Sequence, residues 1–265
     1  MYDEGFLGIA VPLPRPRTAG PLRELDHPRF TVALDPTRRL ARVTGVNIDG
    51  ASLVHLPREG RWRLDDRLLA SEQAGPQLYA RNDLDRGHLV RRRDPGWGEP
   101  AEARAAMAAT FFYPNAAPQA SALNQSKELW LGLEDHVLEY AEATDRRISA
   151  FTAPVLADDD PVYRGVAIPR RFWKVIAWAD ASRDGHLGAA GFVLDQSELL
   201  DLREGVLTVA PLGGFRTFQA PIPDIERLAG IDAGPLASAD VLPQATVRGE
   251  AGWRPLRTDD DILLG

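Results

Sequence analysis

The four consecutive residues Asp85-Arg86-Gly87-His88 combine a candidate base with a candidate anion-binding group. A histidine has an ordinary pKa of about 6.5, so its neutral imidazole can accept a proton from water near neutral pH. A guanidinium two residues away can hold a phosphate or a carboxylate through two parallel hydrogen bonds. The intervening glycine allows the backbone to approach a ligand closely. This combination suits hydrolysis of an anionic ester, although a tetrapeptide alone is a weak signal.

Positive charge is concentrated around this tetrapeptide. The whole chain of 265 residues carries a net charge of −7, which argues against indiscriminate binding of nucleic acid. Residues 58–93 differ from the rest, because they hold nine arginines against six acidic residues. A local basic patch on an acidic protein indicates a site for an anion.

Three further blocks follow in order along the chain: Asn115-Ala-Ala-Pro-Gln119, Leu123-Asn124-Gln125 and Trp130-Leu-Gly-Leu-Glu134. Together with Asp85-Arg-Gly-His88, they make the sequence resemble the DNA/RNA non-specific endonucleases, which are sugar-non-specific nucleases with the ββα-metal fold. Four ordered blocks are a specific match, and a weaker likeness covers most of the chain, from about residue 30 to residue 222.

The resemblance implies a role for five residues. His88 would be the general base that activates the attacking water, and Arg86 would bind the phosphate and stabilise its developing charge. Asn124 would be the one direct protein ligand of a Mg²⁺ ion, with Mn²⁺ as an alternative. Glu134 would act through metal-bound water, and Asn115 would support the site geometry. These roles agree with the preference of Mg²⁺ for few protein ligands, several waters and a phosphate oxygen.

One spacing departs from the family pattern. Asn124 and Glu134 are ten residues apart, two more than the family leads us to expect. Ten residues of an ideal helix place two side chains about 80° apart. Glu134 would therefore reach the metal site only if the helix begins after Asn124 or contains a bulge. Glu128 and Asp135 are alternatives, and we retain Glu134 because Leu133-Glu134 matches the motif.

Arginines on both sides of the tetrapeptide are candidates for binding substrate. The family leads us to expect one such residue upstream, where Arg61, Arg63 and Arg58 surround Trp62, in that order of preference. Downstream, Arg91 and the two arginines that follow it are predicted to track the nucleic-acid backbone, with a solvated loop as the alternative.

The secondary structure that must position these residues is predicted to consist of strands before and after two central helices. Strands are predicted at residues 30–34, 40–48, 148–156, 172–178 and 191–194, and helices at 101–109, 123–143 and 222–229. This order indicates an α+β domain. With the resemblance, it predicts the ββα-metal nuclease fold, a central antiparallel sheet flanked by helices. We expect a proline-rich N-terminal arm (1–28), a single nuclease domain (29–245) and a loosely packed C-terminal tail (246–265).

Composition excludes several other classes. The chain has no cysteine, so disulfide frameworks, thiolate metal sites and cysteine nucleophiles are excluded. No apolar run approaches the roughly 18 residues of a membrane span, so no membrane partner is expected. The first residues, Met1-Tyr2-Asp3-Glu4, lack the layout of a signal peptide. We therefore expect a cytoplasmic protein as written, or a secreted or periplasmic one if an export signal was trimmed; some family members suggest a homodimer.

The sequence thus predicts a Mg²⁺-dependent endonuclease that cleaves DNA and RNA with little sequence preference. One alternative is a phosphodiesterase with similar chemistry that acts on a different phosphate ester. Another is a non-catalytic nucleic-acid-binding module on a nuclease-like fold.

Overall fold

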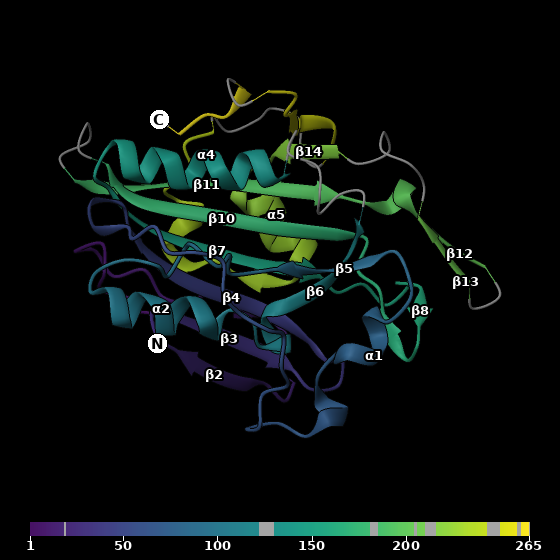
Figure 1. Ribbon diagram of the computed structural model, residues 1–265. Coiled ribbons are helices and arrows are strands. Elements are labelled where there is room, and N and C mark those ends of the chain that lie inside the picture. The colour runs from purple at the N-terminus through teal and green to yellow at the C-terminus, as the bar shows by residue number, and fades with distance from the viewer. Residues whose placement is uncertain are drawn as a thin grey trace.

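A computed structural model describes the chain except residues 19, 122–129, 181–184, 204–205, 210–215, 243–249, 259–260 and 265. Its main element is an antiparallel sheet of eight described strands (Figure 1). In spatial order these are β16 (Arg254–Pro255), β14 (Arg216–Gln219), β11 (His186–Asp195), β10 (Arg171–Asp180), β7 (Arg147–Val155), β4 (Leu40–Asp49), β3 (Phe30–Asp35) and β2 (Arg23–His27).

The central strands are buried on both faces because apolar side chains alternate between two cores. In β10, Phe172, Ile176 and Trp178 belong to one core. Trp173 and Val175 of the same strand belong to the other. Successive side chains of a strand point to opposite faces, so such a run is what a sheet between two layers requires.

Four helices are described. They are α1 (Pro76–Tyr79), α2 (Pro100–Ala109), α4 (Trp130–Ala143) and α5 (Ile222–Ala229). Side chains of α4 join the first core and those of α5 the second, so the two helices lie on opposite faces of the sheet (Figure 1). Helix α5 ends where Gly230 takes the left-handed conformation, with φ of 64°.

Smaller elements complete the described structure. Two-stranded pairs are β1 (Arg15–Pro16) with β15 (Ile231–Asp232), β5 (Leu84–His88) with β6 (Ala116–Ala120), β8 (Val162–Tyr163) with β9 (Val166–Ala167), and β12 (Leu200–Arg203) with β13 (Val206–Val209). Short 3-10 helices occur at Gly50–Ser52, Ala70–Glu72, Tyr113–Asn115, Ser197–Leu199, Gly234–Ala237 and Glu250–Gly252. Among the described residues, no helix has the length and apolar character needed to cross a membrane.

The predicted α+β class with a central antiparallel sheet is confirmed. The five predicted strands correspond to β3, β4, β7, β10 and β11, and the last two pair from Asp180–His186 to Arg171–Asp195. Two segments outside the predicted domain core contribute strands. Within the predicted arm, β2 forms the edge strand beside β3, and within the predicted tail, β16 pairs with β14.

Candidate active site

The Asp85-Arg-Gly-His88 block forms strand β5, which pairs antiparallel with β6 in front of the main sheet (Figure 1). The pairing joins this block to the second one, because Asp85 lies opposite Gln119 and His88 lies opposite Ala116. The predicted strands did not include this tetrapeptide, so the strand is a finding of the structure. Two motif blocks about thirty residues apart thus become neighbours.

Gly87 is required by close packing between the two strands. A Cβ atom at this position would lie 2.2 Å from side-chain atoms of Gln119, which is itself buried. The φ angle of Gly87 lies outside the left-handed region, so the residue serves close approach of the chains and not an unusual backbone conformation. The glycine of the tetrapeptide therefore allows β5 and β6 to pack.

The His88 ring is enclosed by aromatic side chains. Its centroid lies 4.5 Å from that of Trp62 and 5.0 Å from that of Phe111. The Nε2 atom is buried and has no hydrogen-bond partner among the described residues. The residue as a whole keeps part of its surface exposed. One edge of the imidazole is therefore closed to water, and proton exchange must use the other.

The environment holds His88 in its neutral form. Burial lowers the pKa of His88 to about 3, and the positive charges of Arg58, Arg91 and Arg92 act in the same direction. Both effects disfavour the imidazolium, since a buried cation loses hydration and is repelled by neighbouring cations. A neutral imidazole at neutral pH is the form that a general base requires.

Arg86 lies on the same side of β5 as His88, since residues two apart in a strand face the same way. Its guanidinium carbon lies 5.6 Å from the centroid of the Tyr79 ring. It makes no ion pair with a carboxylate within the described part of the chain. A half-buried guanidinium without a carboxylate partner among the described residues is suited to an anionic ligand.

Asn115 is a buried clamp on the chain that follows His88. Its Oδ1 accepts a hydrogen bond from the backbone N–H of Val90 at 2.9 Å. Its Nδ2 donates to the carbonyl oxygens of Val90 and Thr110, at 2.8 and 2.9 Å. Its own carbonyl accepts from the N–H of Leu89. Because these bonds use the side-chain amide and the residue is fully buried, Asn115 holds in place the segment that directly follows β5.

A model of the DNA/RNA non-specific endonucleases matches residues 13–240. The chain belongs to this family. Among curated proteins, it is 34% identical to "Uncharacterized protein y4fB" of Sinorhizobium fredii, over 98% of this chain and 42% of that one. It is 29% identical to mitochondrial Endonuclease G of Homo sapiens, over 66% of this chain and 56% of that protein. The chain thus spans about half the length of these relatives.

The fold is similar to that of a solved structure described as a crystal structure of the EndoG/EndoGI complex and the mechanism of EndoG inhibition. The TM-score is 0.59 at 21% identity, over 82% of this chain and 86% of that one. At this level of identity the likeness shows the fold, which confirms the predicted ββα-metal nuclease architecture.

The residues assigned to the metal by resemblance to the endonuclease family fall largely outside the described part of the chain. Asn124 and the alternative Glu128 lie outside the described residues, as does the side chain of Glu134, which belongs to α4. Asp135, the other alternative, forms an ion pair with Arg91 at 2.5 Å. Within the residues described, no three acidic or histidine side chains converge on a point that would hold a metal ion.

The structure separates the candidate substrate-binding arginines of this endonuclease family member. Arg91, predicted to contact the nucleic-acid backbone, pairs with Asp135. Arg63 lies over the Phe112 ring, with its guanidinium carbon 4.2 Å from the centroid. Arg61 and Arg58 are exposed, and it is the charge of Arg58 that acts on the pKa of His88. Among these three upstream arginines, Arg58, which was ranked last from the sequence, is the one whose charge acts on the pKa of His88.

The sequence reasoning missed the aromatic residues that surround β5. Trp62 contacts both Phe111 and Tyr113, with centroids 5.5 and 5.8 Å apart, and Tyr113 lies 5.9 Å from Tyr79. A usable signal was present, because aromatic residues directly precede Asn115 and an indole stands among the upstream arginines.

Proposed function

We propose that this chain is a metal-dependent endonuclease that hydrolyses phosphodiester bonds of DNA and RNA with little sequence preference. The observation that carries the proposal is the pairing, on one face of β5, of a neutral imidazole with a guanidinium that lacks a described carboxylate partner. Membership of the endonuclease family supports it independently. Contacts to phosphates rather than to base edges would account for indifference to sequence.

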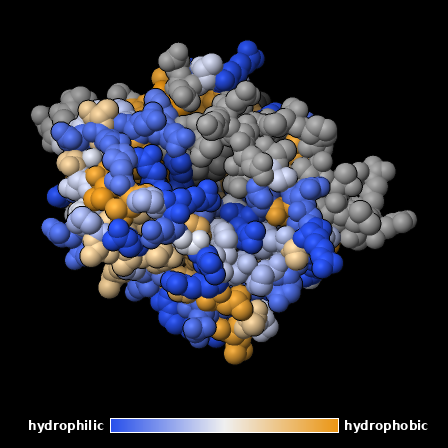
Figure 2. Space-filling model, viewed as in Figure 1, coloured by the Kyte–Doolittle hydropathy of each residue, from blue (hydrophilic) through white to orange (hydrophobic). Residues whose placement is uncertain are grey.

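In the proposed reaction, His88 accepts a proton from the water that attacks the phosphorus atom. The buried position of Nε2 assigns this task to Nδ1. Arg86 binds a non-bridging phosphate oxygen and offsets the charge that accumulates in the transition state. The hydrophilic character of this face of the molecule is suited to a polyanionic substrate, since apolar side chains form only small, separate patches on it (Figure 2).

The donor chemistry that the sequence offers fits a hard divalent cation, Mg²⁺ or Mn²⁺. An asparagine side-chain carbonyl is an oxygen ligand of the type that Mg²⁺ accepts, and we propose Asn124 for this role. When bound, the ion would polarise the phosphoryl oxygen and stabilise the leaving oxygen. The role of Glu134, acting through metal-bound water, remains part of the same proposal.

For the upstream substrate contact we propose Arg58 in place of Arg61. Its side chain is exposed, makes no ion pair among the described residues and is close enough to His88 to disfavour the imidazolium. A phosphate bound there would lie beside the base. Arg61 and Arg63 would then contribute to the general positive potential of the surface.

The test is cleavage of supercoiled plasmid and of RNA, with Mg²⁺, Mn²⁺ or EDTA. The proposal expects cleavage of both substrates with metal and none with EDTA. It expects loss of cleavage in His88→Ala and in Asn124→Ala. The matched control is His186→Ala, which removes an exposed histidine from the start of β11 and should leave cleavage unchanged.

Each rival function has its own signature in the same experiment. Binding of nucleic acid without cleavage under every condition would identify a binding module. Cleavage of a small phosphodiester such as bis(p-nitrophenyl) phosphate, with no action on either nucleic acid, would identify a different phosphodiesterase. Normal cleavage by His88→Ala would overturn the assignment of the base.

A further inference from the structure

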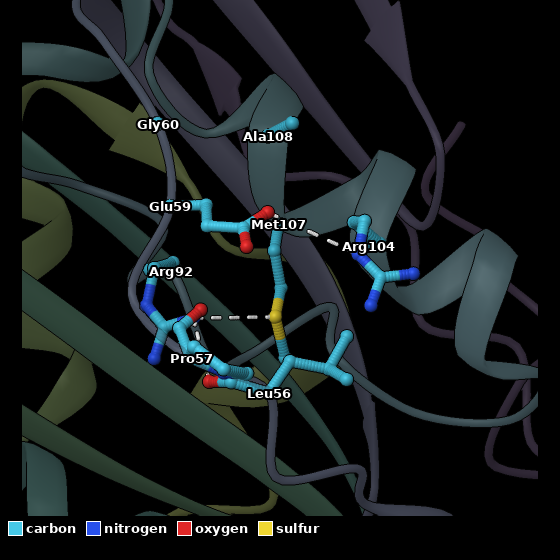
Figure 3. Close-up of a pocket in the computed structure, with 8 residues that line it drawn as sticks. All are labelled: Leu56, Pro57, Glu59, Gly60, Arg92, Arg104, Met107 and Ala108. Carbon is cyan, nitrogen blue, oxygen red and sulfur yellow. Dashed lines mark hydrogen bonds and ion pairs between the residues drawn. The ribbon is translucent and has the colours of Figure 1, made fainter.

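Residues 56–63, here called the strap, cross the candidate site beside His88 and are anchored along their length. Arg92 donates from Nη1 to the carbonyl oxygens of Leu56 and Pro57, at 3.3 and 3.1 Å. Figure 3 shows this anchor together with the approach of Glu59 to Arg104, whose charged groups lie 4.0 Å apart. The first half of the strap is therefore held by two arginines from outside it.

The second half of the strap is held by Phe111 and its neighbours. Gly60 has a φ of +141°, and a Cβ atom there would lie 2.3 Å from the Phe111 ring. The backbone N–H of Arg63 donates to the carbonyl of Phe111, and the N–H of Tyr113 donates to the carbonyl of Arg63, both at 3.0 Å. Trp62 lies between Gly60, which packs against the Phe111 ring, and Arg63, which is held by two backbone hydrogen bonds. The backbone of Trp62 is therefore fixed on both sides.

The indole of Trp62 meets the imidazole of His88 at a ring-centroid distance of 4.5 Å and an interplanar angle of 44°. Phe111 meets the same imidazole edge-on, at 87°. The Nε2 atom is closed from solvent and has no hydrogen-bond partner among the described residues. Two aromatic rings on a fixed backbone thus define the surroundings of the imidazole.

These surroundings distinguish the two neutral forms of the imidazole. A neutral ring carries its proton on either Nε2 or Nδ1. Inside an aromatic enclosure an N–H group can gain a weak N–H···π attraction, whereas a nitrogen lone pair gains none. The enclosed nitrogen should therefore carry the proton, which leaves the lone pair on Nδ1.

We propose that Trp62 is a positioning residue: its indole fixes the orientation of the His88 ring and keeps the proton on Nε2, so that Nδ1 presents its lone pair to the attacking water. The link to water rests on the proposed nuclease function. The effect on ring orientation and on the position of the proton does not, and it can be measured without substrate.

The first measurement is a long-range ¹H–¹⁵N NMR spectrum of the histidine rings, with the His88 signals assigned by their loss in His88→Ala. The proposal expects a single Nε2–H form in the wild-type chain. It expects averaging of the two forms in Trp62→Leu and restoration of the single form in Trp62→Phe, which keeps an aromatic ring. An Nδ1–H form or an averaged spectrum in the wild-type chain would overturn the proposal, whether or not Trp62→Leu and Trp62→Phe fold.

The second measurement is the steady-state kinetics of plasmid cleavage by the same variants. Misplacement of a catalytic group by about 1 Å costs on the order of 100-fold in rate, so Trp62→Leu should lower kcat by about 10- to 100-fold with KM nearly unchanged. Trp62→Phe should retain most of kcat. The matched control is Trp97→Leu, because Trp97 is also half-buried but donates its indole N–H to Asn47, away from His88.

The outcomes separate this inference from the proposed function. If His88→Ala is inactive while Trp62→Leu keeps wild-type kcat and a single Nε2–H form, Trp62 does not position the base and the nuclease function stands. If Trp62→Leu is more active than the wild type, the indole blocks the site and the inference is wrong. If His88→Ala remains active, the proposed function fails, and the NMR spectra alone decide the positioning role.

Discussion

Replacing Asn115 by alanine tests whether β5 is held by a single buried amide. The substitution leaves three backbone groups without their partners: the N–H and carbonyl of Val90 and the carbonyl of Thr110. Each lost hydrogen bond costs about 1 kcal/mol net, and a buried group left unpaired costs about 1–3 kcal/mol. The three lost bonds therefore predict a loss of at least about 3 kcal/mol in the free energy of unfolding, a large part of the roughly 5–15 kcal/mol typical of a domain.

The assay is urea unfolding at pH 7, followed by plasmid cleavage under conditions where each variant is folded. Asn115→Asp should be at least as destabilising as Asn115→Ala, because an acceptor oxygen replaces the donor that faces two carbonyl oxygens. The matched control is Gln219→Ala, which removes two comparable bonds to the backbone of Leu263, far along the chain. Gln219→Ala should lose about 2 kcal/mol of its free energy of unfolding and keep its cleavage activity.

Two results would refute this reasoning. A loss below about 1 kcal/mol in Asn115→Ala would mean that water or backbone relaxation replaces the clamp. Equal cleavage rates for folded Asn115→Ala and Gln219→Ala would mean that the segment after His88 does not need the clamp to place the base.

Three further predictions concern the same strand and its surroundings. Gly87→Ala should destabilise the fold by about 1–3 kcal/mol through overlap with Gln119, and most of this loss should disappear in a Gln119→Ala background; equal losses in both backgrounds, measured by urea unfolding, would exclude the overlap. The pKa of His88 is about 3 in the folded chain and about 6.5 when unfolded, so its contribution to stability is complete above pH 6.5 and falls by about 1.4 kcal/mol per pH unit below it. Between pH 7 and pH 5, the free energy of unfolding of His88→Gln should therefore fall by about 2 kcal/mol less than that of the wild type. Parallel plots of the free energy of unfolding against pH for the two proteins would contradict the lowered pKa. Arg58→Ala should weaken plasmid binding and reduce the salt dependence of log K by about one unit of slope, with a smaller effect from Arg61→Ala; a salt titration that ranks the two variants in reverse order would reject Arg58 as the phosphate contact.

The long strands β3, β4, β7, β10 and β11 and the helix α5 were predictable because their signals are local. Helix α5 occupies Ile222–Ala229 as predicted, since a proline precedes it and a glycine ends it. The long aromatic and β-branched runs of β7 and β10 are typical of strands in any context. The family was also predictable, because the four motif blocks and their order are properties of the chain itself.

By itself, the sequence determined which side chains are available for chemistry and where the long strands of the main sheet and helix α5 lie. Only the tertiary structure decided how these parts meet. It turned Asp85-Arg-Gly-His88 into a strand paired with Ala116–Ala120, although its short polar sequence lacks a strand pattern. It brought the Trp62 ring into contact with the His88 ring, and it paired the Asp135 carboxylate with the Arg91 guanidinium. The physical reason is that such contacts depend on packing between residues 26 to 44 positions apart, and periodicity along the chain carries no record of them.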